Sequence, residues 1–92
     1  MAEHSFEDAA NEFRSIVGKK NDEVSNEDKL TAYGWYKQAT EGDNPKGPSG
    51  MFSFGAESAK SDAWCKNKGV SKEEAKKEYI KFVYEVAIPK YS

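Results

Sequence analysis

The stretch of sequence that decides the fold is YGWYKQATEGD, residues 33–43. Tyr33 and Lys37 stand four residues apart and therefore share one face of a helix, with Tyr36 at its flank. A cation beside phenols suits a phosphorylated nucleotide, because lysine offers charge and donors to phosphate and an aromatic ring stacks on a purine. On spacing alone we favour a simpler interpretation, in which the aromatic residues are core and the lysine is solvated.

A helix over about Asn26–Glu41 is expected to contain this stretch. Ser25 followed by Asp28 is a typical helix start, and Gly42 suits the helix end. The apolar and aromatic residues cover more than one stripe, so we expect this helix to be central and to contact neighbours on two sides.

The chain before this helix predicts a first helix over about Phe6–Val17. Its apolar residues fall at one-stripe spacing. Ser5 is the expected N-cap, and Gly18 is expected to be the left-handed residue after the helix end.

The chain after residue 43 predicts a loop and two more helices. Asp43–Gly50 contains Pro45 and Pro48, a composition that excludes regular helix. A third helix is expected over about Glu57–Asn67, with Gly69 at its end.

The last helix begins with Ser71 and Glu74 in a capping-box arrangement and is expected to run to about Ile88, where Pro89 stops it. Its inward stripe is expected to be Ala75, Tyr79, Ile80, Val83 and Val86.

These elements predict an all-α, four-helix bundle, and 92 residues are expected to form one domain over 1–92. The net charge of -2, from 14 basic and 16 acidic residues, argues against a nucleic-acid partner. Cys65 is the single cysteine and closes no internal disulfide, which indicates a reducing compartment. The N-terminal residues lack the pattern of a signal peptide, so we expect a cytoplasmic protein and, by default, a monomer.

The same residues bear on three other functional classes: an enzyme, a metal-binding protein and a protein-interaction module. An enzyme needs a positioned acid, base or nucleophile, but His4 precedes every expected helix and Cys65 lacks a histidine partner, so no catalytic residue is assigned. One histidine and one cysteine give no metal-ligand spacing. The remaining alternative is a protein-interaction module that exposes Trp35 and Tyr36 to a partner helix.

Residues 33–43 resemble the signature of the acyl-CoA-binding proteins, commonly written Y-x-x-Y-K-Q-A-T-x-G-D. Three further segments strengthen the resemblance, which spans nearly the whole chain: Pro48-Ser-Gly50-Met51, Ala59-Lys60-Ser61-Asp62-Ala63-Trp64 and Gly69-Val-Ser71-Lys72-Glu73, with Tyr79-Ile80 beyond them.

The resemblance implies an up-down-down-up bundle that binds medium- to long-chain fatty acyl-CoA esters. It implies an intracellular carrier and pool former that transforms nothing chemically and needs no cofactor. Acyl-CoA-using enzymes and membranes are the implied transient partners.

The resemblance also implies roles for individual residues. Tyr33, Lys37 and Lys60 would meet the ribose 3′-phosphate, and Tyr36 would line the adenine site. Arg14 stands where the family usually has a lysine near the phosphates. The remaining contacts are implied for Tyr79, which would wall the ligand, and for Phe6, Ala10 and Leu30, which would border it.

The chain departs from the family pattern at two places near this site. Ser61 follows Lys60 where the family usually has an aromatic residue, most often tryptophan. The connection between the first two helices is longer by several residues, and the span from Met51 to Lys60 by one.

Overall fold

A computed structural model describes residues 4–20, 22–45 and 55–91, and for 55–57 only the backbone. The motif around Pro48 and Met51 lies outside the described residues. All regular elements in the described part are helices: α1 (Phe6–Lys20), α2 (Asn26–Glu41), α3 (Gly55–Cys65), α4 (Lys72–Phe82), the π-helix η1 (Val83–Ala87) and α5 (Ile88–Tyr91).

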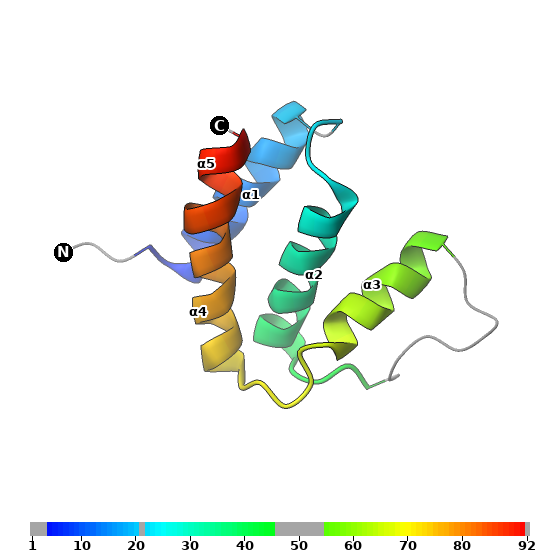
Figure 1. The fold of residues 1–92 in the computed structure, drawn as a ribbon. Helices are drawn as coiled ribbons and strands as arrows, with labels where there is room; N and C mark the ends of the chain where they lie inside the picture. Colours follow the sequence, from blue (N-terminus) through cyan, green and yellow to red (C-terminus); the bar gives the residue numbers. More distant parts are fainter. Residues whose placement is uncertain (1–3, 21, 46–54, 92) are drawn as a thin grey trace.

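The last three elements follow one another without a break, so the fold consists of four helical rods (Figure 1). In this view α1 runs upward, α2 and α3 run downward, and the α4–η1–α5 rod runs upward. The expected all-α bundle and its up-down-down-up topology are confirmed.

Helix α2 is the central element. It packs against α4 on one side and against α3 on the other, whereas α1 packs along the α4–η1–α5 rod. The expectation of neighbours on two sides is therefore confirmed. The described helices include none that is long and apolar enough to cross a membrane.

Three serines start three of the helices as expected. Ser5, Ser25 and Ser71 each accept a hydrogen bond from the backbone N–H three residues later, at 3.0, 3.1 and 3.1 Å. Each bond satisfies a backbone donor that the first helical turn leaves unpaired.

The end of α1 differs from the expectation. The helix continues through Gly18 to Lys20, and the positive-φ glycines of the described residues are Gly42 and Gly69 instead. Glycine permits a left-handed residue but does not require one. Lys19 and Lys20 favour continuation, since cations are stabilising in the last turn of a helix.

The C-terminal rod buries every fourth residue: Ala75, Tyr79, Val83, Ala87 and Tyr91, which are 0 to 7 % exposed. In a regular α-helix, residues four apart are offset by about 40° around the helix axis, so a series at this spacing gradually turns away from the core. The π turn of η1, in which the Ile88 N–H bonds to the Val83 carbonyl, adds a residue to one turn and brings Ala87 and Tyr91 back to the core side.

The same π turn corrects two expectations. Val86 is 40 % exposed rather than inward, because the extra residue moves Ala87 into its place. Pro89 does not stop the helix but lies inside α5. A wider turn shifts the carbonyl that the proline ring would otherwise meet, and proline needs no acceptor for an N–H.

Tyr91 joins the end of the rod to the start of α2. Its hydroxyl accepts from the Ser25 N–H at 3.1 Å and donates to the Asp28 carboxylate, which Lys90 also contacts at 2.9 Å. Burial acts to raise the pKa of Asp28, but the hydrogen bonds from Tyr91, Lys90 and Ser25 together hold that pKa below its usual value.

Gln38 joins the other end of α2 to the α3–α4 connection. This fully buried amide donates to Asp43 Oδ1 at 2.9 Å and to the Val70 carbonyl at 2.7 Å. The Gly69 N–H donates to the same Asp43 oxygen at 2.9 Å, and this bond, with that of Gln38, lowers the pKa of Asp43. The turn after α2 is thereby fixed against residues 69–70.

Gly34 sets the distance between α2 and α3. A Cβ at this position would lie 2.6 Å from the backbone oxygen of Ala63 and 3.0 Å from the Asn67 side chain. Side-chain relaxation cannot relieve a clash with backbone, so the two helices approach this closely only with glycine here.

We predict that Gly34→Ala lowers the free energy of unfolding by about 1 to 3 kcal/mol, as overpacking does, despite the better helix propensity of alanine. Urea denaturation measures the change. The matched control is Gly18→Ala in α1, where a Cβ meets nothing within 4 Å and a gain of about 0.4 to 1 kcal/mol is expected. Equal stability of the two variants would contradict the close-approach explanation.

We predict that Tyr91→Phe destabilises the fold by about 1 to 3 kcal/mol near neutral pH, because the Ser25 N–H and the Asp28 carboxylate both lose a partner. The folded pKa of Asp28 is below its unfolded value, so its contribution is present above about pH 4 and is lost as pH falls through the folded pKa. Thermal unfolding at several pH values should show the difference from wild type shrinking in acid.

The control for Tyr91→Phe is Tyr84→Phe, which removes a hydroxyl from a half-buried ring stacked on His4. If both variants lose the same stability with the same pH dependence, the Tyr91–Asp28 contact is not what secures the rod.

Candidate functional site

One face of α1 forms the first wall of a cleft. Its residues are Ala10, Phe13, Arg14, Val17 and Gly18, spaced by three or four and therefore aligned along the helix. Ala10 is buried and Phe13 is half-buried, whereas Arg14 is exposed. The wall is thus apolar with a cation on its outer side.

One face of α2 forms the opposite wall. Lys29, Ala32, Tyr33 and Tyr36 follow the same spacing and place a second cation and two phenol rings along the cleft.

Tyr79 from α4 and Lys60 from α3 complete the enclosure, which we call the main cleft. Its volume is about 620 Å³, within the range of small-molecule sites. Three cations, Arg14, Lys29 and Lys60, line an otherwise largely apolar space, an arrangement suited to an anionic amphiphile.

Three aromatic rings pack together beside this cleft, and two of them, those of Tyr36 and Tyr79, line it. The ring centroids of Phe6 and Tyr79 are 5.1 Å apart, those of Phe6 and Tyr36 are 5.4 Å apart, and those of Tyr36 and Tyr79 are 5.8 Å apart. These separations are typical of stabilising aromatic pairs. Phe6 therefore supports the two tyrosines that face the cleft.

Tyr79 is 3 % exposed, and its burial, with a smaller contribution from Tyr36, raises its pKa to about 12. The phenol is therefore neutral at physiological pH and can donate a hydrogen bond.

A smaller rim pocket, about 280 Å³, opens beside the main cleft and shares Tyr33 and Lys60 with it. Its lining residues are Tyr33, Glu41, Asn44, Pro45, Lys60, Ser61 and Trp64. The Lys60 ammonium lies 5.7 Å from the Tyr33 ring centroid, and the Asn44 amide donates to Ser61 Oγ at 3.2 Å. A polar pair thus occupies the position where Ser61 departs from the family pattern.

Lys37 lies beside the rim pocket rather than in the main cleft. Its ammonium is 4.9 Å from the Trp64 ring centroid and forms an ion pair with Glu41. The hydrogen bond to Glu41 raises the pKa of Lys37, which therefore stays charged at neutral pH.

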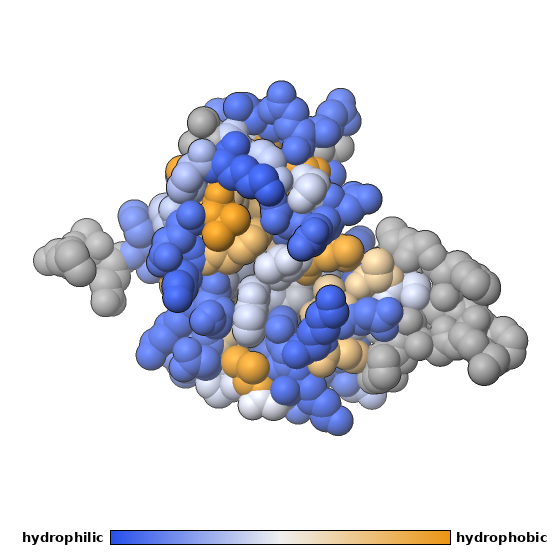
Figure 2. Space-filling view, viewed as in Figure 1, coloured by the Kyte–Doolittle hydropathy of each residue, from blue (hydrophilic) through white to orange (hydrophobic). Residues whose placement is uncertain are grey.

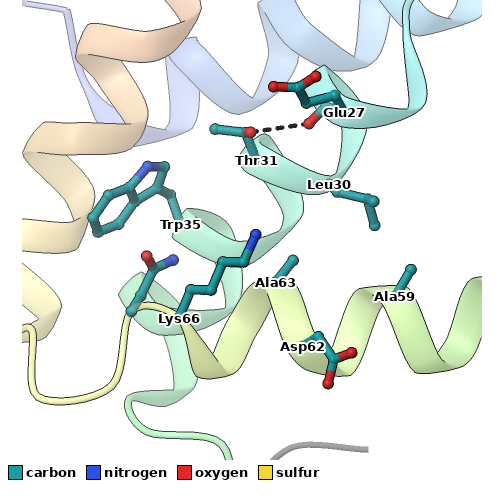
Figure 3. A pocket seen from close by; sticks show the side chains of 9 residues that line it. Glu27, Leu30, Thr31, Trp35, Ala59, Asp62, Ala63 and Lys66 are labelled. Carbon is teal, nitrogen blue, oxygen red and sulfur yellow. Dashed lines mark hydrogen bonds between the residues drawn. The ribbon is translucent and has the colours of Figure 1, made fainter.

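Leu30 lies in a third depression, the α2–α3 groove, of about 470 Å³. Leu30 from α2 and Ala59 and Ala63 from α3 point toward one another across this groove (Figure 3), whereas Asp62 points away from α2. Most of the visible surface in Figure 2 is hydrophilic, with apolar residues in small patches.

The structure thus brings six of the nine expected site residues to the main cleft: Ala10, Arg14, Tyr33, Tyr36, Lys60 and Tyr79. Phe6 supports it from behind, Lys37 flanks the rim pocket and Leu30 lies in the α2–α3 groove.

Sequence reasoning missed Phe13, Val17, Gly18, Lys29 and Ala32 as cleft residues. Helical spacing from Ala10 and Arg14, and from Tyr33 and Tyr36, would have found them.

Other chemically reactive residues lie away from these depressions. The His4 ring stacks on Tyr84 with a centroid distance of 3.6 Å, and Cys65 is half-buried on α3. Within the described residues, no group of three or more His, Cys, Asp or Glu is placed to hold a metal ion. Trp35 and Tyr36 are partly buried against the core, which argues against the alternative in which they form an exposed patch for a partner helix.

The fold and cleft define a helical bundle with a ligand-sized site. The family model for acyl-CoA-binding protein matches residues 3–83, and the chain belongs to this family.

Two relatives cover nearly the whole chain. Acyl-CoA-binding protein 2 of Saccharomyces pastorianus is 40% identical over 92 residues, which are 100% of this chain and 99% of the relative. Acyl-CoA-binding protein homolog 1 of Caenorhabditis elegans is 39% identical over 87 residues, 95% and 94% of the two chains. The crystal structure of Oryza sativa acyl-CoA-binding protein 2 superposes with a TM-score of 0.65 at 40% identity, over 88% of this chain and 92% of that one.

We predict that Tyr79 ionises near pH 12, above the ordinary tyrosine range, because its phenolate would be desolvated. Ultraviolet titration of wild type and Tyr79→Phe should differ by a phenolate signal that appears only above about pH 11. Since the raised pKa stabilises the fold below pH 10 and this contribution is lost between about 10 and 12, alkaline unfolding should accompany the signal. If the wild type shows a phenolate signal near pH 10 that Tyr79→Phe lacks, Tyr79 ionises as an ordinary tyrosine and the buried assignment is wrong.

Proposed function

We propose that this protein binds medium- to long-chain fatty acyl-CoA esters one to one and carries them without chemical transformation. The observation that carries the proposal is the main cleft, where aromatic walls and three cations surround one ligand-sized apolar space. A coenzyme A ester combines the matching parts, a purine, phosphates and a long apolar chain. Family membership supports the same function.

The head group is assigned to the main cleft and the rim pocket. Tyr33 and Lys60 line both spaces and Lys37 lies beside the rim pocket, and these three residues would bind the ribose 3′-phosphate through charge-assisted hydrogen bonds. Tyr36 would stack against the adenine and Arg14 would meet the other phosphates. Tyr79, with Phe6 and Ala10, would form the wall behind them.

The acyl chain is assigned to the α2–α3 groove. Lys29 and Lys60 line the main cleft, while their sequence neighbours Leu30 and Ala59 line this groove, so the two depressions lie on neighbouring faces of α2 and α3. Burying a methylene contributes about 0.8 kcal/mol, so about sixteen carbons supply on the order of 10 kcal/mol before the costs of binding.

The setting proposed for this function is the cytoplasm, with the protein acting as a monomer over one domain, residues 1–92. Its transient partners would be enzymes that use acyl-CoA or membranes, and no nucleic acid. The acidic balance of the chain supports the last point.

Calorimetric titration with palmitoyl-CoA, free coenzyme A and palmitate tests the proposal. We expect tight one-to-one binding of the ester and much weaker binding of either half. Lys37→Ala should weaken ester binding about tenfold or more, since a charge-assisted hydrogen bond contributes about 1.5 to 3 kcal/mol.

The matched control is Lys77→Ala, which removes an exposed lysine of α4 and should leave binding unchanged. Absence of ester binding in the wild type would refute the carrier function. Equal effects of the two lysine variants would refute the phosphate assignment alone.

A further inference from the structure

Glu41 is a carboxylate in the pocket assigned to a phosphate. It lines the rim pocket together with Tyr33 and Lys60, and its carboxylate holds the Lys37 ammonium in an ion pair. Lys37 and Glu41 are 25 % and 51 % exposed, so a ligand in the pocket can reach both. The Glu41 carboxylate is therefore a negative charge close to the proposed position of the ligand's 3′-phosphate.

Apart from the ion pair with Lys37, helix stability disfavours an acid at this position. Glu41 is the last residue of α2, and that last turn contains no basic residue. The negative end of the helix dipole disfavours a carboxylate there. The order Lys37 then Glu41 is also the weaker orientation for a pair four residues apart.

A residue that breaks local rules at a ligand site points to a functional role. The competing explanation, that Glu41 merely positions Lys37, is weakened because Trp64 already lies 4.9 Å beneath the ammonium.

We propose that Glu41 is an internal counter-ion that competes with the ligand's 3′-phosphate for Lys37 and thereby limits affinity, an inference that rests on the proposed function. In the free protein Glu41 neutralises Lys37. On binding, the phosphate takes over the ammonium, and the displaced carboxylate remains nearby as a like charge. The pair therefore sets how readily the carrier releases its ester, and Glu41 determines affinity specifically for 3′-phosphorylated ligands.

The test compares Glu41→Gln with wild type by calorimetric titration with palmitoyl-CoA and 3′-dephospho-palmitoyl-CoA. The measurements are made at about 0.01 M and about 0.15 M salt, where the Debye lengths are about 30 and 8 Å. Removing one negative charge beside the phosphate is expected to tighten palmitoyl-CoA binding about threefold to tenfold at low salt. The gain should shrink at the higher salt and be absent for the dephospho ester.

The matched control is Glu85→Gln, which makes the same charge change at an exposed residue of η1 that lines none of the three depressions. Unchanged or weaker binding by Glu41→Gln would overturn the inference. An equal gain with the dephospho ester, or in Glu85→Gln, would also overturn it. Failure of the wild type to bind either ester would instead refute the proposed function.

Discussion

The buried amide of Gln38 is the interaction on which the rest of the structure depends. It holds Asp43 and the Val70 carbonyl together, so that the end of α2 and the α3–α4 connection form one unit. Trp64 adds a bond from its indole N–H to the Gly42 carbonyl at 2.7 Å. These bonds fix the C-terminal end of α3 against α2, and Lys60 on α3 can then face Tyr33. Without them the two walls of the rim pocket would not be held in register.

Residues 33–43 therefore combine two kinds of residue that a sequence pattern does not separate. Tyr33 and Tyr36 line the main cleft and Lys37 lies beside the rim pocket, whereas Gly34, Gln38 and Asp43 are structural. In the core, one residue has both roles, since Tyr79 is a core residue and also a wall of the main cleft. A small bundle has few buried positions, so its site must be built from residues that also stabilise the fold.

The charge around the site is opposite in sign to the net charge of the chain. The chain is net acidic, yet the main cleft gathers Arg14, Lys29 and Lys60. Glu41 then partly offsets the cation beside that cleft. A carrier must bind its ester and also release it, and an opposing charge at the site would serve release by offsetting part of the attraction between the cations and the ligand.

Sequence alone determined the helices and their serine caps, because these follow from periodicity and local hydrogen bonding. The family resemblance, rather than periodicity, supplied six of the eleven residues that line the main cleft. Sequence reasoning failed at Gly18, where the lysines that follow favour continuation of the helix, and at Val86 and Pro89, where packing overrode the local signals. No local sequence pattern predicts the π turn that returns Ala87 and Tyr91 to the core. The turn keeps every fourth residue of the rod buried against helices that are distant in the sequence. Only the tertiary structure separated Leu30 from the main cleft and placed the Lys37–Glu41 pair of α2 beside Trp64 of α3, because both depend on how closely α3 approaches α2 across Gly34.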